Sequence, residues 1–175
     1  IIHLIVLYYI FFSKYKLYMS FTLDKDSDNY ATDKHGWKII KDFIPNNKKI
    51  WSPFYCDGKQ KEYFKEMGYD IIHEDEDFFT NNKGDIIIDN PPYSKWFDIC
   101  FRLKELEKPF ILIAPPRAFT TKKFQNLFKD HLQIIIPNKR LTFTKLNQES
   151  VGYTPPFGTW FFCYKINLEK DLNFI

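Results

Sequence analysis

The sequence predicts an α/β protein with a doubly wound, mostly parallel sheet that ends in an antiparallel hairpin. Short apolar runs alternate with segments of helical periodicity from Lys49 to Ile136, the pattern of consecutive βαβ units. The region after Ile136 is rich in aromatic strand residues without helical spacing, which indicates the hairpin. With 175 residues, 45% hydrophobic and 27% charged, the chain fits one globular domain.

Residues 1–18 stand apart from this pattern. Residues 1–12 are nearly all apolar, but a membrane-spanning helix needs about 20 such residues. A basic start and a small-residue cleavage site, which a signal peptide requires, are lacking. Met19 and Ser20 resemble a natural start. We therefore expect residues 1–18 to be a non-native or disordered extension, with a peripheral membrane anchor as the alternative, and residues 19–175 to form the domain.

The elements are assigned in chain order from apolar periodicity and from the residues that bound each segment. Short apolar runs predict strands at 49–54, 70–73, 85–89, 109–114, 132–136 and 159–165, with a further short strand at 140–144. Helical spacing predicts a helix capped by Thr32 or Asp33 and ended by Pro45, one between Gly58 and Gly68, one over 96–106 and one over 120–130.

The tetrapeptide Asn90-Pro91-Pro92-Tyr93 is the strongest functional signal in the chain. It follows a buried apolar run and so lies at the carboxyl end of a parallel strand, where open α/β sheets bind ligands. The two prolines cannot continue a sheet ladder, and they fix the backbone. Such a turn suits a site in which a side-chain amide and a proline carbonyl point at one donor atom. The alternative is a plain strand end before a helix.

Two further stretches are expected to face the same site. Residues 52–58 (SPFYCDG) form a turn that presents backbone N–H groups to a ligand and leaves room for it at Gly58. An acidic run ends in Asp77-Phe78, where a carboxylate can accept hydrogen bonds from ribose or an adenine amine and the ring can lie on a base. For Asp75 and Glu76 we expect a solvated acidic loop.

Composition limits the partners that the chain can have. A net charge of +3 permits a polyanion partner without requiring one, and the aromatic share of 19% favours stacking surfaces. The three cysteines are far apart, so we expect neither a disulfide framework nor a metal site, and a reducing, cytoplasmic setting. The isolated His35, His73 and His131 are interpreted as ordinary structural or surface residues.

Taken in order, these motifs resemble those of the S-adenosylmethionine-dependent N6-adenine DNA methyltransferases. Residues 52–58 match the family's first motif, except that Cys56 stands at a glycine position. Asp77-Phe78 matches the motif that holds the cofactor's adenine, and residues 90–93 match the catalytic Asn-Pro-Pro-Tyr pattern. The resemblance spans about residues 30–165 and implies a Rossmann-like class I methyltransferase fold.

The resemblance implies a role for each matched residue, with S-adenosyl-L-methionine as the cofactor. The implied catalytic residues are Asn90, Pro91, Pro92 and Tyr93. The implied cofactor residues are Tyr30, Thr32, Ser52, Pro53, Phe54, Asp57, Gly58, Glu74, Asp77 and Phe78, with Glu74 chosen as the ribose-binding acid and Asp70 second. Phe157 resembles the late aromatic that lies against the target base.

Basic residues in two loops are expected on or near the active face. Arg117, Lys122 and Lys123 follow the strand that ends at Ala114, and Lys139-Arg140 follow Pro137-Asn138. We expect Arg117, Lys139 and Arg140 to contact nucleic acid, preferably DNA, with solvated surface charge as the alternative for each residue.

The expected reaction is methyl transfer to the exocyclic amine of adenine, flipped out of DNA into a pocket at residues 90–93. Tyr93 and Phe157 are expected to stack on the base, and no metal is required. RNA adenine, a protein glutamine, or a catalytically inactive binding module on the same fold remain alternatives. The chain leaves no room for a sizeable target-recognition domain, so a homo- or hetero-oligomer is compatible with it. Its richness in Lys, Ile, Asn and Phe is compatible with an AT-rich phage or viral genome, and then with the cytoplasm or nucleoid of a host cell.

Overall fold

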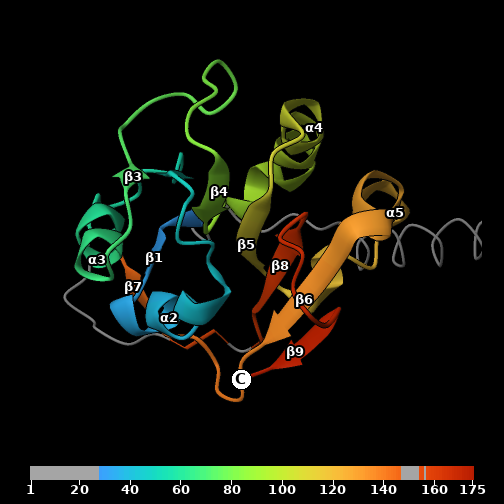
Figure 1. Cartoon of the computed structure of the whole chain (residues 1–175). Helices are drawn as coiled ribbons and strands as arrows, with labels where there is room; N and C mark the ends of the chain where they lie inside the picture. The colour runs from blue at the N-terminus through green and yellow to red at the C-terminus, as the bar shows by residue number, and fades with distance from the viewer. Residues whose placement is uncertain (1–27, 147–153, 156) are drawn as a thin grey trace, which may run out of the picture.

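The computed structural model describes residues 28–146, 154–155 and 157–175, so the expectation for residues 1–18 lies outside the described part. Its centre is a seven-stranded sheet of order β3-β2-β4-β5-β8-β6-β9 (Figure 1). The strands are β2 (Ile50–Trp51), β3 (Ile71–Ile72), β4 (Ile86–Asp89), β5 (Phe110–Ala114), β6 (Leu132–Ile136), β8 (Trp160–Tyr164) and β9 (Leu172–Phe174).

The sheet is mostly parallel, as the sequence predicts. β3, β2, β4 and β5 run in one direction, and β9 is parallel to β6. β8 is antiparallel to both β5 and β6, and it lies inside the sheet rather than in a hairpin at its end. The residues Phe161–Tyr164 are all buried, so the backbone of β8 needs hydrogen-bond partners on both edges. The sequence analysis missed β9, which forms the edge instead.

Helices cover both faces of the sheet (Figure 1). Alternate strand residues enter two cores: Ile86 and Ile88 belong to one, and Ile87 to the other. The first core is closed by α2 (Lys34–Lys38) and α3 (Gln60–Glu66), and the second by α4 (Trp96–Leu106) and α5 (Lys122–Phe128). Burial on both faces explains why these strands appear in the sequence as continuous apolar runs.

α3, α4 and α5 begin and end close to the expected places, but α2 ends at Lys38, well before Pro45, and a 3₁₀ turn follows it. Asp33 precedes α2, but its carboxylate accepts a hydrogen bond from the Thr144 hydroxyl at 2.8 Å instead of capping the helix. Thr121 caps α5 by accepting from the Phe124 N–H. Among the described residues, 3₁₀ turns extend the pattern at η2 (Lys41–Phe43), η3 (Tyr93–Lys95), η4 (Pro116–Ala118) and η5 (Lys129–His131).

A second, two-stranded antiparallel sheet joins β1 (Tyr30–Thr32) to β7 (Phe143–Lys145). Strand β7 overlaps the short strand expected at 140–144. The pairing sets Tyr30 opposite Lys145 and Thr32 opposite Phe143. It therefore brings two segments that are distant in sequence together.

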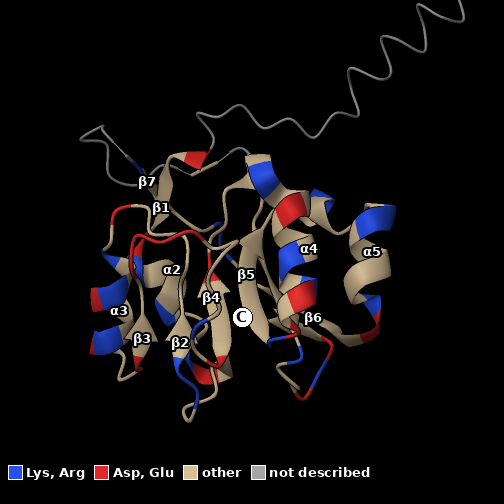
Figure 2. Ribbon diagram, turned by 90° about the horizontal axis from the view of Figure 1, so that it is seen from above, with Lys and Arg blue, Asp and Glu red and all other residues tan. Residues whose placement is uncertain are grey.

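One edge of the main sheet gathers the loops of interest. The carboxyl ends of the parallel strands meet there, and β8 begins there because Trp160 pairs with Ala114. Charged side chains lie on the helices and loops, whereas β2, β4 and β5 are tan over most of their length (Figure 2). Within the described ranges, no helix has the length and apolar character needed to cross a bilayer.

Candidate active site

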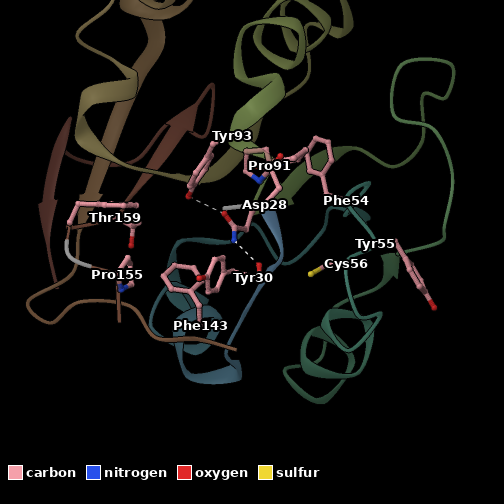
Figure 3. A pocket seen from close by; sticks show the side chains of 13 residues that line it. Asp28, Tyr30, Phe54, Tyr55, Cys56, Pro91, Tyr93, Phe143, Pro155 and Thr159 are labelled. Atoms are coloured by element: carbon pink, nitrogen blue, oxygen red, sulfur yellow. Dashed lines mark hydrogen bonds between the residues drawn. The ribbon is translucent and has the colours of Figure 1, made fainter. Parts of the chain in front are cut away.

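A cavity of about 420 Å³ lies at this edge, where β4 ends and the turn after β2 begins (Figure 3). Cavities of this size accommodate small organic ligands. The residues expected at the site that line it are Tyr30, Phe54, Asn90, Pro91, Pro92, Tyr93 and Phe157. Tyr55 and Cys56, from the stretch 52–58 that was expected to face the site, also line it. The lining residues that were not expected from sequence are Asp28, Phe143, Pro155 and Thr159.

Two hydrogen bonds orient the side chain of Asn90, which lines this cavity. Its Oδ1 accepts from the Tyr93 hydroxyl at 3.1 Å, and its Nδ2 donates to the Tyr30 carbonyl at 3.5 Å. The second distance is at the limit for a hydrogen bond, so it contributes weakly. Asn90 lines the cavity, and its amide is held by residues from β1 and from the turn that follows β4.

Tyr93 acts on Asn90 through its hydroxyl. The ring is 8% exposed and packs edge-on against Trp96, with the ring centroids 6.5 Å apart. The hydroxyl lies 3.1 Å from Asn90 Oδ1 and 3.2 Å from the Ile113 carbonyl oxygen. A hydroxyl has one proton to donate, so these two acceptors share it. Burial raises the pKa of Tyr93, which keeps the hydroxyl protonated.

Asp89 is a site residue that the sequence analysis did not assign. Its side chain is 1% exposed, and its Oδ2 accepts from the Ser52 hydroxyl at 2.9 Å and the Phe54 N–H at 2.7 Å. Its Oδ1 accepts from the Asn90 N–H at 2.8 Å. Burial raises the pKa of Asp89 to about 7, although these hydrogen bonds oppose the shift. An acid at the end of an otherwise apolar strand is the signal that could have identified it.

The turn after β2 adopts a conformation that favours glycine at two positions. Cys56 has a φ of 50° and Gly58 a φ of 76°, and the Gly58 N–H donates to the Tyr55 carbonyl at 2.8 Å. Cys56 therefore occupies a left-handed conformation that costs a non-glycine residue energy. The Tyr55 ring points away from the cavity and stacks on His73, with the centroids 5.1 Å apart (Figure 3).

The other residues expected at this turn are buried beneath it or make contacts within it. Ser52 and Pro53 are buried. The Asp57 carboxylate accepts from the Lys59 N–H at 3.1 Å and pairs with the Lys59 ammonium at 3.3 Å. Asp57 and Thr32 line a smaller hollow next to the main cavity. The Thr32 hydroxyl is buried there without a hydrogen-bond partner.

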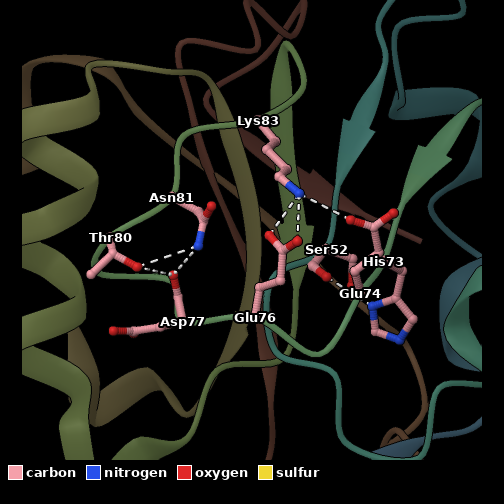
Figure 4. A network of polar contacts seen from close by, with 8 residues as sticks. All are labelled: Ser52, His73, Glu74, Glu76, Asp77, Thr80, Asn81 and Lys83. Atoms are coloured by element: carbon pink, nitrogen blue, oxygen red, sulfur yellow. Dashed lines mark hydrogen bonds and ion pairs between the residues drawn. The ribbon is translucent and has the colours of Figure 1, made fainter.

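The acidic stretch after β3 is organised by a separate network (Figure 4). Lys83 pairs with Glu74 at 2.9 Å and with Glu76 at 2.6 Å, and the Lys83 contact lowers the pKa of Glu74. Asp77 turns the chain, since its carboxylate accepts from the Phe79 N–H at 3.0 Å. Glu74 and Asp77 are both exposed, and neither lines the main cavity.

Phe78 packs behind a residue that lines the cavity, whereas Asp70 lies far from the cavity. The Phe78 ring is buried against Trp51 and Phe54, with centroid distances of 5.5 and 5.1 Å. Phe78 therefore supports Phe54, which does line the cavity. Asp70 precedes β3 and pairs with Lys49 at 3.1 Å, at the opposite end of the strand from the cavity.

Only some of the residues expected to contact the acceptor lie close together in the structure. Arg117, in η4, lies over the Phe157 ring with its guanidinium carbon 5.1 Å from the centroid. Lys139 and Arg140 are exposed in the loop that follows β6 on the same edge of the sheet. The structure thus pairs Arg117 with Phe157 at the cavity, and it leaves Lys139 and Arg140 as surface charges nearby.

The lining residues missed from sequence depend on distant pairings. Phe143 reaches the cavity because β7 pairs with β1, and Thr159 because β8 begins beside the end of β5. Asp28 accepts from the Ser94 N–H at 3.2 Å. No local pattern marks these residues. Among the residues that the structure describes, no group of three or more His, Cys, Asp and Glu side chains is placed to hold a metal ion.

Comparison with known proteins gives a distant similarity. The Type II methyltransferase M.EcoRI of Escherichia coli is 28% identical over 111 residues, which cover 54% of this chain and 34% of that protein. The matched part thus spans about a third of the relative's length. No family model and no solved structure matches the chain.

Proposed function

We propose that the chain is an S-adenosylmethionine-dependent methyltransferase with a Rossmann-like class I fold that methylates the exocyclic amine of adenine in DNA. One observation contributes most to this proposal. Asn90 lines the cavity at the carboxyl end of a parallel strand, directly before Pro91, and hydrogen bonds to Tyr93 and Tyr30 orient its amide. The distant similarity to a methyltransferase supports the reaction class.

The residues around the cavity fit a cofactor of this kind. The turn 52–58 approaches the cavity with left-handed backbone at Cys56 and Gly58, and the Thr32 hydroxyl is a buried polar group without a partner in the adjoining hollow. Tyr30, Phe54 and Asp57 are proposed to hold the cofactor there. When bound, S-adenosylmethionine supplies a methyl group activated by a sulfonium.

The proposed ribose-binding acid is Glu74, which must leave Lys83 to act. Their ion pair is at the surface, where solvent screening leaves such pairs with little effect on stability. The rearrangement therefore costs little. It would turn a carboxylate at the end of β3 toward the cofactor without a change in the sheet.

The chain's own contribution to the chemistry is position and polarisation. The lone pair of an adenine amine is delocalised into the ring, so the amine is a poor nucleophile. Hydrogen bonds from the amine to Asn90 Oδ1 and the Pro91 carbonyl would draw it toward tetrahedral geometry. The Tyr93 hydroxyl can donate to Ile113 instead, which frees Asn90 Oδ1 for the amine. Alignment of this kind supplies most of the proposed acceleration.

Phe157 and Arg117 are proposed to hold the base. Arg117 lies over the Phe157 ring, and Phe157 lines the cavity, where a base would stack on it. Stacking on an aromatic ring is worth about 1–3 kcal/mol. This offsets much of the cost of flipping a base, which is a few kcal/mol. Lys139 and Arg140 would contact phosphates on the same edge, which favours nucleic acid over a protein acceptor.

Incubation with methyl-labelled cofactor and separate DNA, RNA and protein acceptors tests the proposal. We expect label in DNA, at N6 of adenine. Label in RNA or in a glutamine amide would keep the chemistry and change the acceptor.

An inactive binding module is the alternative from another class, because Cys56 takes a strained conformation where glycine is favoured. Calorimetry with S-adenosylmethionine distinguishes the two. We expect saturable binding, whereas no detectable heat of binding supports the inactive module.

A further inference from the structure

The Asp89 carboxylate connects two loops that the proposed reaction needs to hold at a fixed separation. We propose that Asp89 is a positioning residue that links the turn after β2 to Asn90. It thereby fixes the position of the proposed cofactor-binding turn relative to the Asn90 amide, which would bind the acceptor amine. This role rests on the proposed function.

The hydrogen bonds of Asp89 divide between the two loops. One oxygen, Oδ2, holds the Ser52 hydroxyl and the Phe54 N–H, which are 37 and 35 residues away in sequence. The other oxygen, Oδ1, holds the N–H of Asn90. Because both oxygens belong to one planar group, a displacement of either loop is passed to the other. The contacts are 2.7–2.9 Å long and buried, as in firmly held hydrogen bonds.

Only a carboxylate satisfies this set of donors. All three partners donate, so an asparagine in place of Asp89 would turn an N–H against another N–H at one of the two positions. An apolar residue would leave the Phe54 and Asn90 N–H groups buried without acceptors, which is costly. The Gln60 side-chain amide donates to the carbonyl of Ile88, the residue before Asp89, at 3.1 Å.

The charge state of Asp89 controls the link. The groups in direct contact with its carboxylate are neutral: a hydroxyl, two backbone amides and the Gln60 carboxamide. The neighbouring titratable groups are the Cys56 thiol and His73, whose Nδ1 lies 2.8 Å from the Ser52 carbonyl oxygen. Burial lowers the pKa of His73 and raises that of Asp89 to about 7. Protonation of Asp89 converts one acceptor into a donor, so the link weakens as the pH falls through 7.

Amide resonances report this link without cofactor or acceptor. In the wild-type protein we expect the Phe54 and Asn90 N–H signals to shift together with one midpoint near pH 7. His73→Gln should keep the transition, and Asp89→Asn should remove it from both amides. Separate midpoints, a transition in only one amide, or its persistence in Asp89→Asn would overturn the proposal.

A milder variant tests the consequence for the reaction and covers the case in which Asp89→Asn does not fold. Ser52→Ala removes one of the three donors. We expect it to weaken S-adenosylmethionine binding and to slow methyl transfer at saturating cofactor, each by about fivefold. Thr121→Ala removes the α5 cap, a stability loss of similar size away from the cavity, and should change neither quantity.

The outcomes separate this proposal from the proposed function. An effect of Ser52→Ala on only one of the two quantities, or the same double effect in Thr121→Ala, would contradict the role of Asp89. A wild-type protein that binds no cofactor and transfers no methyl group would refute the proposed function, while the amide titration would still test the link.

Discussion

Two loops at the same edge of the sheet are held in different ways. The loop after β4 is fixed by buried groups: Asp89 accepts three hydrogen bonds, and Asn90 is oriented by Tyr93. The acidic loop after β3 is held by exposed ion pairs between Lys83 and two glutamates. Buried hydrogen bonds give a fixed geometry, whereas exposed ion pairs are weak and exchangeable. The first loop suits alignment of reacting atoms, and the second suits adjustment to a bound molecule.

The largest effect expected from this difference is on stability. The pKa of Asp89 is raised from 3.8 to about 7 in the folded protein. The folded state therefore binds more protons than the unfolded state between these values, and the stability that Asp89 contributes is lost as the pH rises through 7. A pKa difference of this size corresponds to on the order of 4 kcal/mol.

Urea unfolding of the wild type and of Asp89→Asn at pH 4.5 and pH 8 measures this dependence. Relative to the variant, the wild type should lose free energy of unfolding at the higher pH. If the difference in free energy of unfolding between the two proteins does not change with pH, ionisation of Asp89 does not destabilise the folded protein. That result would contradict the difference between the two loops.

Phe157→Ala tests the acceptor side of the cavity. Loss of a stacking surface worth about 1–3 kcal/mol should raise the KM for DNA by about 5- to 150-fold and leave cofactor affinity unchanged. Phe101→Ala, an exposed aromatic on α4, provides the control and should have no effect. Equal loss of cofactor affinity in Phe157→Ala would mean that this ring serves the cofactor rather than the base.

Cys56→Gly tests the strain in the turn after β2. Glycine adopts a φ of 50° freely, so the variant should be more stable by up to about 1 kcal/mol and bind S-adenosylmethionine up to about fivefold more tightly. Thermal unfolding and calorimetry measure the two effects. Asn167→Gly, at another positive φ on the surface, controls for glycine itself and should leave binding unchanged. Weaker binding by Cys56→Gly would assign the thiol a direct role.

Lys83→Ala should give the smallest effect. The change removes a partner of Glu74 at the surface, where ion pairs are screened by solvent, so the free energy of unfolding should barely change. Release of Glu74 should tighten cofactor binding slightly, by at most about fivefold. Lys49→Ala breaks the comparable pair with Asp70 at the far end of β3 and should not affect binding. Weaker binding by Lys83→Ala would argue against Glu74 as the ribose contact.

Sequence patterns predicted the centre of the fold because burial on both faces gives a continuous apolar run. β4 and β5 are such runs, and their positions agree with the prediction to within a residue. β9 was missed because it is short, exposed and carries only Leu172 and Phe174 as apolar residues. The place of β8 between β5 and β6 was also missed, because strand order depends on packing across the whole sheet.

The residues of the candidate site also fall into those marked by a local sequence signal and those placed by strand pairings that are distant in sequence. Asn90 and Tyr93 were predicted because a strand end followed by two prolines is a local signal. Phe143 and Thr159 were not, because they reach the cavity through pairings with strands that are distant in sequence. The family resemblance implied a role for Glu74 as the ribose-binding acid, but no sequence signal indicated its ion pair with Lys83.

Asn90→Ala provides the most direct test of the central claim, that a fixed amide beside a proline carbonyl positions the acceptor amine. Methyl transfer to DNA and cofactor binding are measured on the same preparation. Removal of one transition-state hydrogen bond of this kind costs about 10²- to 10³-fold in rate. We predict that Asn90→Ala loses methyl-transfer rate by this factor, while its affinity for the cofactor stays within about twofold of the wild type. Turnover retained near the wild-type rate would contradict the claim.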